Sequence, residues 1–248
     1  MSEKLVALQL YTVRDETARD FKGTIRRVAS LGYPAVEFAG YGDLSAAETK
    51  DLLKETGLRG VSTHVGWSEL EKNLDYHINY CLEIGCPHLV LPSLPHEWHN
   101  ADSFRTLAPQ MNEIGRRCQE RGLSFGYHNH DFEFQQSDGQ YLLDILFSAT
   151  DPALVSFELD TYWAAYAGVD PIAYLRQHAG RIPLIHLKDM TADRHYTEVG
   201  DGTLDIAGIC RAAQESGTRF YIVEHDAPTI PSLESARRSL ENLRKLGF

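Results

Sequence analysis

The sequence predicts an α/β protein built as a single closed barrel of eight parallel strands, and three observations indicate this fold. Short β-rich runs alternate with longer helical patterns from end to end, without a Pro/Ser/Gly-rich linker between them. Eight strand–helix units divide the 248 residues into about 31 each, and such barrels routinely reach about 250 residues as one domain. The first strand runs into LQLYTVRDE, which has no glycine, whereas an open doubly wound sheet typically has a glycine-rich phosphate loop there. We therefore predict one domain over residues 1–248.

The strands are predicted from short runs rich in β-branched, aromatic and other apolar residues. A parallel strand is covered on both faces, so it reads as nearly continuous hydrophobics, and helical crossovers join it to the next strand. In chain order the predicted strands are Leu5–Leu10, Ala35–Phe38, Leu58–His64, His88–Leu94, Ser124–His128, Val155–Asp160, Pro183–Lys188 and Phe220–His225.

The helices are predicted from amphipathic stretches between these strands. In Phe21–Leu31 the apolar positions 21, 25, 28 and 31 recur at three- and four-residue steps, which is one face of a helix. Further stretches of this kind span residues 44–57, 70–85, 101–122 and 204–217. Many of them end in a glycine, the usual C-terminal cap, namely Gly32, Gly57, Gly85, Gly122 and Gly217.

Composition and charge exclude several classes of protein. The chain is 43% hydrophobic and 24% charged, which rules out disorder, and no run of about 18 apolar residues predicts a membrane span. With 24 Lys and Arg against 35 Asp and Glu, the formal net charge is −11, so we expect no nucleic-acid partner. The N-terminal residues lack the features of a secretory signal, and the four sparse cysteines indicate reduced thiols, so we expect a cytoplasmic protein.

Ionisable and polar residues end seven of the eight predicted strands. Residues two apart in a strand share a face, so Glu158 and Asp160 point the same way, as do His186 and Lys188. In a barrel the inward-facing members converge above the strand ends, where active sites of this fold lie. The full set is Gln9, Tyr11, Glu37, His64, His128, His130, Glu158, Asp160, His186, Lys188, Glu224 and Asp226.

A cluster of carboxylates and imidazoles in a small buried volume is costly unless a cation compensates it. Three or four Glu, Asp and His side chains around an open position suit one divalent metal ion. Because the ligand set lacks a thiolate, Mn²⁺, Mg²⁺, Co²⁺ and Zn²⁺ are the candidates, and a structural zinc site is not.

Several motifs resemble the sugar phosphate isomerase/epimerase superfamily, the xylose isomerase-like barrels. They are LDTYW with Asp160, IHLKD with His186, EVGDGTLDI, and IVEHD with Glu224, and the resemblance runs from LQLYTVRDE through GYPAVEF to VEHD. It implies that Asp160, His186 and Glu224 are metal ligands. The fifth-strand acid of the family is replaced here by His128 in FGYHNHDFEF, so Glu133 in the following loop is the expected fourth ligand and His128 its alternative.

The resemblance implies an isomerase or epimerase that acts on a keto-sugar or cyclitol through a metal-stabilised enediolate. Glu224, His128 or Glu158 is the expected base, and Lys188 stabilises an oxyanion or holds the substrate. An alternative on the same site is a dehydratase or lyase of an inosose or 3-keto-glycoside. The remaining residues assigned to substrate binding are Glu37, His64, His130 and Trp163.

Two other functions compete with that of a sugar-converting enzyme. An endonuclease IV type phosphodiesterase would need more metal ligands and a basic surface, and a non-catalytic barrel would have lost the ligand set.

We expect a small-molecule sugar or cyclitol, without phosphate, as the substrate; no membrane partner is expected, and a homo-oligomer is possible by analogy with the superfamily. The EVGDGTLDI segment is either a substrate-covering loop or a turn before the helix near Leu204.

Overall fold

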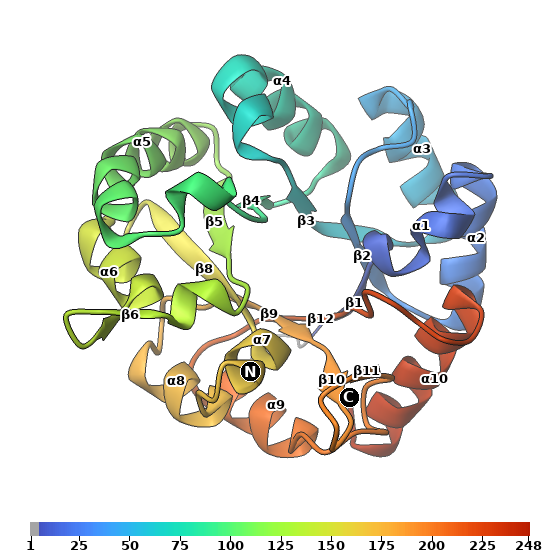
Figure 1. Ribbon diagram of the computed structural model, residues 1–248. Coiled ribbons are helices and arrows are strands. Elements are labelled where there is room, and N and C mark those ends of the chain that lie inside the picture. The colour runs from blue at the N-terminus through green and yellow to red at the C-terminus, as the bar shows by residue number, and fades with distance from the viewer. Residues whose placement is uncertain (1–4) are drawn as a thin grey trace.

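The computed structural model describes residues 5–248 and confirms the closed α/β barrel. Eight parallel strands close in the order β1-β12-β9-β8-β5-β4-β3-β2, so each strand pairs with the barrel strand before and after it in the chain. Figure 1 looks along the barrel, with the strands as an inner ring and the helices around them. The closed barrel of eight parallel strands predicted from the sequence is therefore the observed fold. Whether one domain spans the whole of residues 1–248 stays a prediction.

The strands lie where the sequence places them, with small differences at their ends. The run predicted to reach Leu94 stops at Leu91, because Pro92 has no N–H to continue the ladder. The barrel strands are β1 Leu5–Gln9, β2 Ala35–Phe38, β3 Arg59–His64, β4 His88–Leu91, β5 Ser124–His128, β8 Val155–Asp160, β9 Leu184–Leu187 and β12 Phe220–Val223. Two short hairpins lie outside the barrel, β6 Gln136–Ser137 with β7 Gln140–Tyr141, and β10 Asp189–Met190 with β11 Tyr196–Thr197.

Helix α2, Phe21–Leu31, begins and ends at capping residues that the sequence provides. The Asp20 side chain accepts a hydrogen bond from Gly23 N at the start of α2, and Gly32 ends it with a φ of 96°. The α-helices are α1 Arg14–Thr17, α2 Phe21–Leu31, α3 Ala46–Thr56, α4 Trp67–Ile84, α5 Ala101–Glu120, α6 Leu142–Ala149, α7 Thr161–Tyr166, α8 Pro171–Gln177, α9 Ile206–Glu215 and α10 Ser232–Lys245. Short 3-10 turns are η1 Leu10–Val13, η2 His96–Trp98 and η3 Phe132–Phe134. None of the helices within residues 5–248 has the length and apolar character needed to cross a membrane.

The barrel interior has an apolar floor and a polar upper part. A small buried cluster fills the lower interior, and its members include Leu184, Phe220 and Ile222. Because alternate residues of a strand face the same side, His186 follows Leu184 into the interior, and Glu224 continues the face of Phe220 and Ile222. The large hydrophobic core lies between the outer face of the strands and the helices. The fold therefore gathers polar side chains at the carboxyl ends of the strands.

Candidate functional site

A cavity of about 490 Å³ opens at the carboxyl ends of the strands. Several of its lining residues were predicted from the sequence, namely His64, His128, His130, Lys188 and Glu224. The lining also includes Tyr11, Ala39, Pro92, Ser93 and Asp226. The remaining predicted residues lie beneath or beside this lining.

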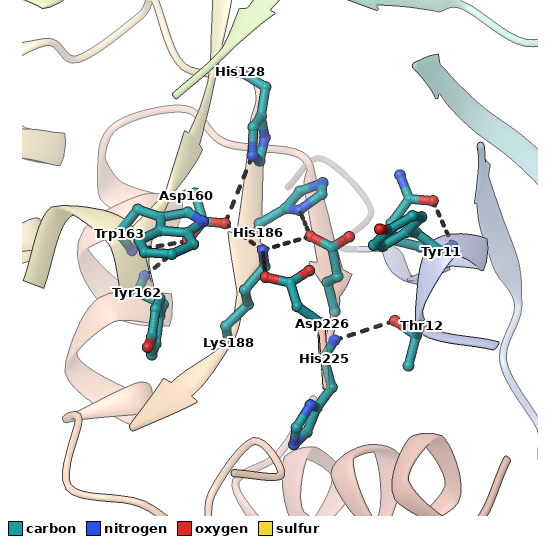
Figure 2. Close-up of polar contacts among 12 residues, drawn as sticks. Tyr11, Thr12, His128, Asp160, Tyr162, Trp163, His186, Lys188, His225 and Asp226 are labelled. Atoms are coloured by element: carbon teal, nitrogen blue, oxygen red, sulfur yellow. Dashed lines mark hydrogen bonds and ion pairs between the residues drawn. The ribbon is translucent and has the colours of Figure 1, made fainter. Parts of the chain in front are cut away.

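Lys188 occupies the acidic side of the site. Its Nζ lies 3.1 Å from Asp160 Oδ2, 2.8 Å from Glu224 Oε2 and 2.9 Å from Asp226 Oδ2. In Figure 2 its side chain extends between Asp160 and Asp226 and its end is surrounded by carboxylate oxygens. Burial opposes the charge of this ammonium, but Asp160, Glu224 and Asp226 hold its pKa well above its usual value. Lys188 is therefore a fixed positive charge inside the site.

His186 lies between two carboxylates. Its Nδ1 is 2.8 Å from Glu224 Oε2 and its Nε2 is 2.6 Å from Glu37 Oε1. Glu37 is itself held by Gln9 Nε2, which donates to Oε1 at 2.6 Å, and by the Ser62 hydroxyl, which donates to Oε2. Burial opposes protonation of His186, but the charges of Glu158, Glu37 and Glu224 raise its pKa well above its usual value.

Three imidazoles converge on one oxygen of Glu158. Its Oε2 lies 2.7 Å from His64 Nε2, 3.0 Å from His128 Nδ1 and 3.2 Å from His186 Nε2. Burial alone would raise the pKa of Glu158, but the charges of His186 and His64 hold it well below its usual value. Burial and the neighbouring charge of His186 lower the pKa of His128. Glu158 is therefore a buried anion beneath the cavity.

The carboxylates around Lys188 differ in how readily they ionise. Burial raises the pKa of Asp160 to about 6, and Lys188 only partly offsets this rise. Burial also acts to raise the pKa of Glu224, but the charges of Lys188 and His186 hold it well below its usual value. Glu224 is therefore an ionised carboxylate facing the cavity.

The residues present fit a divalent metal ion, as two observations show. Asp160, His186 and Glu224 place one ligand atom each within 4.8 Å of one another, and so do His64, His128, Glu158 and His186. Asp160 Oδ2 is buried and forms an ion pair with Lys188 at 3.1 Å, but it accepts no hydrogen bond. The other oxygen, Oδ1, accepts the Tyr162 and Trp163 amides that start α7. Oxygen and imidazole donors with an unsatisfied carboxylate oxygen suit Mn²⁺, Zn²⁺ or a similar ion. The trio carried over from the resemblance is thus brought together.

Glu133 lies apart from both of these groups. Its Oε1 accepts the Tyr127 hydroxyl at 2.6 Å and its Oε2 accepts the His130 amide at 2.8 Å, and burial raises its pKa to about 8. Tyr127 precedes His128 on β5, so its side chain points away from the interior. The expected fourth ligand is therefore used to fix the loop after β5. His128, the alternative fourth ligand, lies beside the trio, with its Nε2 at 3.7 Å from Asp160 Oδ2.

Two predicted substrate-binding residues lie away from the cavity lining. Glu37 is completely buried beneath His64 and His186, so it supports the site from below. Trp163 stands beside the opening, where its ring lies 5.8 Å from Lys188 Nζ and 5.7 Å from the His130 ring. Burial and the charge of Lys188 lower the pKa of His130 to about 4, so this lining residue is a neutral imidazole at pH 7.

The EVGDGTLDI segment is anchored as a turn. Asp189, buried at the start of β10, accepts hydrogen bonds from the amides of Met190, Gly200, Gly202 and Leu204 at 2.8–3.2 Å. These bonds join the segment to the strand end next to Lys188. The structure therefore agrees with the interpretation as a turn, and the segment is absent from the cavity lining.

Tyr11 and Asp226 were predicted among the polar residues at the strand ends, but neither was given a role in catalysis, metal binding or substrate binding. Each stands two residues beyond a residue that points into the interior, Gln9 or Glu224, and the structure places both in the cavity lining. Arg14 links them, because it donates to the backbone oxygen of Tyr11 at 2.9 Å and to that of Asp226 at 2.7 Å.

Comparison with protein families finds one model that matches residues 25–246, and it describes a xylose isomerase-like TIM barrel. Among curated proteins, the inosose dehydratase of Clostridium beijerinckii is 25% identical, over 92% of this chain and 90% of that protein. The inosose dehydratase of Lacticaseibacillus casei is 31% identical over 49% of this chain and 46% of that protein.

Solved structures give the same picture of the fold. A sugar phosphate isomerase/epimerase from Parabacteroides distasonis superposes with a TM-score of 0.84 at 26% identity, over 98% of this chain and 94% of that one. The D-allulose 3-epimerase of Methylomonas sp. superposes with a TM-score of 0.76 at 14% identity, over 99% of each chain. At that identity the second likeness concerns the fold alone.

Proposed function

The chain belongs to the xylose isomerase-like TIM barrel family, and from this premise we propose that it is a lyase that removes water from an inosose or a related cyclic polyhydroxy ketone. The observation that carries the proposal is an ionised carboxylate, Glu224, paired with a buried ammonium, Lys188, in the lining of the cavity. The similarity to inosose dehydratases over nine tenths of both chains supports the dehydratase over the isomerase.

Dehydration next to a ketone needs a base for one proton and a donor for the departing hydroxyl group. We assign the base to Glu224, whose carboxylate is ionised and faces the cavity. The carbon–hydrogen bond next to the carbonyl breaks and its proton goes to Glu224. The electron pair then forms the new double bond as the β-carbon–oxygen bond breaks, and the hydroxyl leaves as water with the proton that Glu224 took from carbon.

Lys188 and His130 complete the polar lining in this proposal. The Lys188 ammonium donates hydrogen bonds to a substrate oxygen and offsets the negative charge that develops there. His130 is neutral, so it can accept a hydrogen bond from a hydroxyl group of the substrate. A divalent ion held by Asp160, His186 and Glu224, with His128 beside them, would polarise the carbonyl oxygen when bound.

The charge of the cavity favours a substrate without phosphate. Lys188 is the single Lys or Arg among the lining residues, all of which lie in the described part of the chain, and three carboxylates already neutralise it. The two arginines nearest the strand ends are engaged elsewhere. Arg14 bonds to backbone oxygens at the rim, and Arg194 lies 4.1 Å from the Tyr166 ring and donates to its carbonyl. An uncharged polyol ketone therefore suits the cavity better than a sugar phosphate.

A direct assay tests this proposal. The purified protein is incubated with an inosose and each candidate metal in deuterated buffer, and the products are followed by mass spectrometry and ultraviolet absorbance. We expect a product lighter by one water molecule and a rise in absorbance from the conjugated ketone. Recovery of an isomer that carries solvent deuterium, with no loss of water, would replace the lyase by the second candidate.

The second candidate is a metal-dependent isomerase or epimerase on the same site, the main expectation from the sequence. The likeness to the Parabacteroides distasonis sugar phosphate isomerase/epimerase favours it, since it covers nearly all of both chains. Both reactions begin with the same proton abstraction, so Glu224 has the same task in each. They differ in where the proton returns, which the deuterium experiment reports.

A further inference from the structure

Lys188 forms ion pairs with the same carboxylate oxygens that the proposed metal ion would need as ligands. Its Nζ lies 3.1 Å from Asp160 Oδ2 and 2.8 Å from Glu224 Oε2, and these two residues belong to the ligand trio. An ammonium and a divalent cation that contact the same carboxylate oxygens repel one another, and the low exposure of the site leaves little water to screen them. Both cations cannot hold these oxygens in the present arrangement.

The third carboxylate around Lys188 offers a separate position. Asp226 lies beyond Glu224, nearer the opening, and its side chain is 21% exposed whereas that of Asp160 is fully buried. Its Oδ2 is 2.9 Å from Lys188 Nζ, and Asp226 is absent from both groups of potential metal ligands. Asp226 can therefore keep its ion pair with Lys188 while Asp160 and Glu224 turn to a metal.

We infer that Lys188 is a built-in competitor of the metal, and that Asp226 is the residue that holds the Lys188 ammonium when an ion takes Asp160 and Glu224. This inference rests on the metal site of the proposed function, but not on the reaction. Without metal, the tethered ammonium compensates the buried carboxylates. With metal, the ammonium moves toward the opening, where a substrate oxygen can meet it.

The experiment measures the dissociation constant for Mn²⁺ by electron paramagnetic resonance or calorimetry on the full chain at one pH. The variants are Lys188→Met, Asp226→Asn and the double variant. We expect Lys188→Met to bind Mn²⁺ at least about tenfold more tightly, because the competing charge is gone. We expect Asp226→Asn to bind about tenfold more weakly, because Lys188 then stays on Asp160 and Glu224.

The double variant separates this inference from a simple effect of charge. If Asp226 acts by holding Lys188, Asp226→Asn loses most of its effect once Lys188 is methionine. If Asp226 acts through its own negative charge, the effects of the two single substitutions on Mn²⁺ affinity add in the double variant. That result would contradict the role that we infer for Asp226. Two results would overturn the inference that Lys188 competes with the metal. They are an unchanged Mn²⁺ affinity in Lys188→Met, and no Mn²⁺ binding in either the wild type or Lys188→Met.

Thermal unfolding supplies a second readout that needs no turnover. Metal-free Lys188→Met should melt below the wild type, since three carboxylates lose their partner, and Mn²⁺ should raise its melting temperature more than that of the wild type. Lys50→Met is the matched control, because Lys50 pairs with exposed Glu83 at 2.8 Å outside the site. Tighter Mn²⁺ binding by Lys188→Met, together with no dehydration of the inosose by the wild-type protein, would remove the proposed reaction and leave this inference standing.

Discussion

Glu37 on β2 holds His186 on β9 through a 2.6 Å contact between two fully buried side chains. Two strands, β1 and β12, separate β2 from β9 around the barrel, so this contact crosses the interior. Because Glu37 contacts Nε2 of the His186 ring, the other ring nitrogen, Nδ1, is turned toward Glu224 and the cavity. A carboxylate that fixes the ring of a metal-binding histidine in this way typically raises the affinity of the site.

Replacing Glu37 should therefore weaken metal binding, although Glu37 is absent from the cavity lining and from both groups of potential metal ligands. We expect Glu37→Gln to raise the Mn²⁺ dissociation constant by about tenfold, within the usual range for partners of metal-binding histidines. A titration followed by electron paramagnetic resonance measures it. Ser62→Ala is the control, since Ser62 bonds to Glu37 but not to His186, and its effect should be smaller. Equal Mn²⁺ affinity in the wild type and Glu37→Gln would show that the ring needs no support from Glu37.

The sequence was sufficient to predict the barrel and to place the site at the carboxyl ends of its strands. Alternating apolar patterns mark the eight strands, and parallel strands bring their carboxyl ends to one rim, so residues such as Asp160, His186 and Glu224 had to converge. The two-residue period also predicted that Lys188 shares the face of His186. These predictions depend on periodicity and topology, which a single sequence contains.

Other features depend on distances across the interior or on loop direction, which a single sequence does not contain. Glu133 follows β5 in a short 3-10 turn, and the turn carries its carboxylate to Tyr127 instead of the interior. Glu37 ends a strand like its neighbours, but the shape of the barrel places it beneath His186. Asp189 is next to Lys188 in the chain and faces the opposite way, so it anchors a loop while Lys188 joins the site.

Glu224→Gln should abolish turnover and preserve the fold. Glutamine has the same shape but cannot take a proton from carbon, so we expect the catalytic rate to fall at least about 100-fold. The inosose assay measures the rate, and circular dichroism and metal content measure whether the fold and the ion remain. Glu198→Gln is the matched control, because Glu198 is also mostly buried but absent from the cavity lining. Wild-type turnover in Glu224→Gln would remove Glu224 from the mechanism.

Asp189 should be important for stability through the loop that it anchors. Asp189→Ala removes one acceptor for four backbone amides, so we expect a loss of about 3 kcal/mol in the free energy of unfolding. Urea denaturation measures this loss. Gly202→Ala should also destabilise the protein, because an added Cβ would lie 2.2 Å from Asp189 Oδ1. Asp193→Ala, an exposed residue of the same region, is the control and should change little; an equal loss there would argue against the anchor.

His88, which lies outside the cavity, should make the stability depend on pH. It lies at the start of β4 against Phe220, with its Nδ1 buried and without a hydrogen bond, and burial lowers its pKa from 6.5 to about 4. A histidine whose pKa is lowered by folding destabilises the protein once the unfolded chain takes up a proton. Its contribution is therefore intact above pH 6.5 and is lost progressively as the pH falls to about 4.

Lowering the His88 pKa from 6.5 to about 4 corresponds to roughly 3 kcal/mol of unfolding free energy across this interval. His88→Leu removes the titration, so the difference in stability between the wild type and the variant should change by about that amount between pH 7 and pH 4. Urea denaturation at several pH values measures this difference, and the other titrating groups cancel because both proteins contain them. Parallel pH profiles would mean that His88 gains a partner or water on protonation. In that case its burial would not control the acid sensitivity of the barrel.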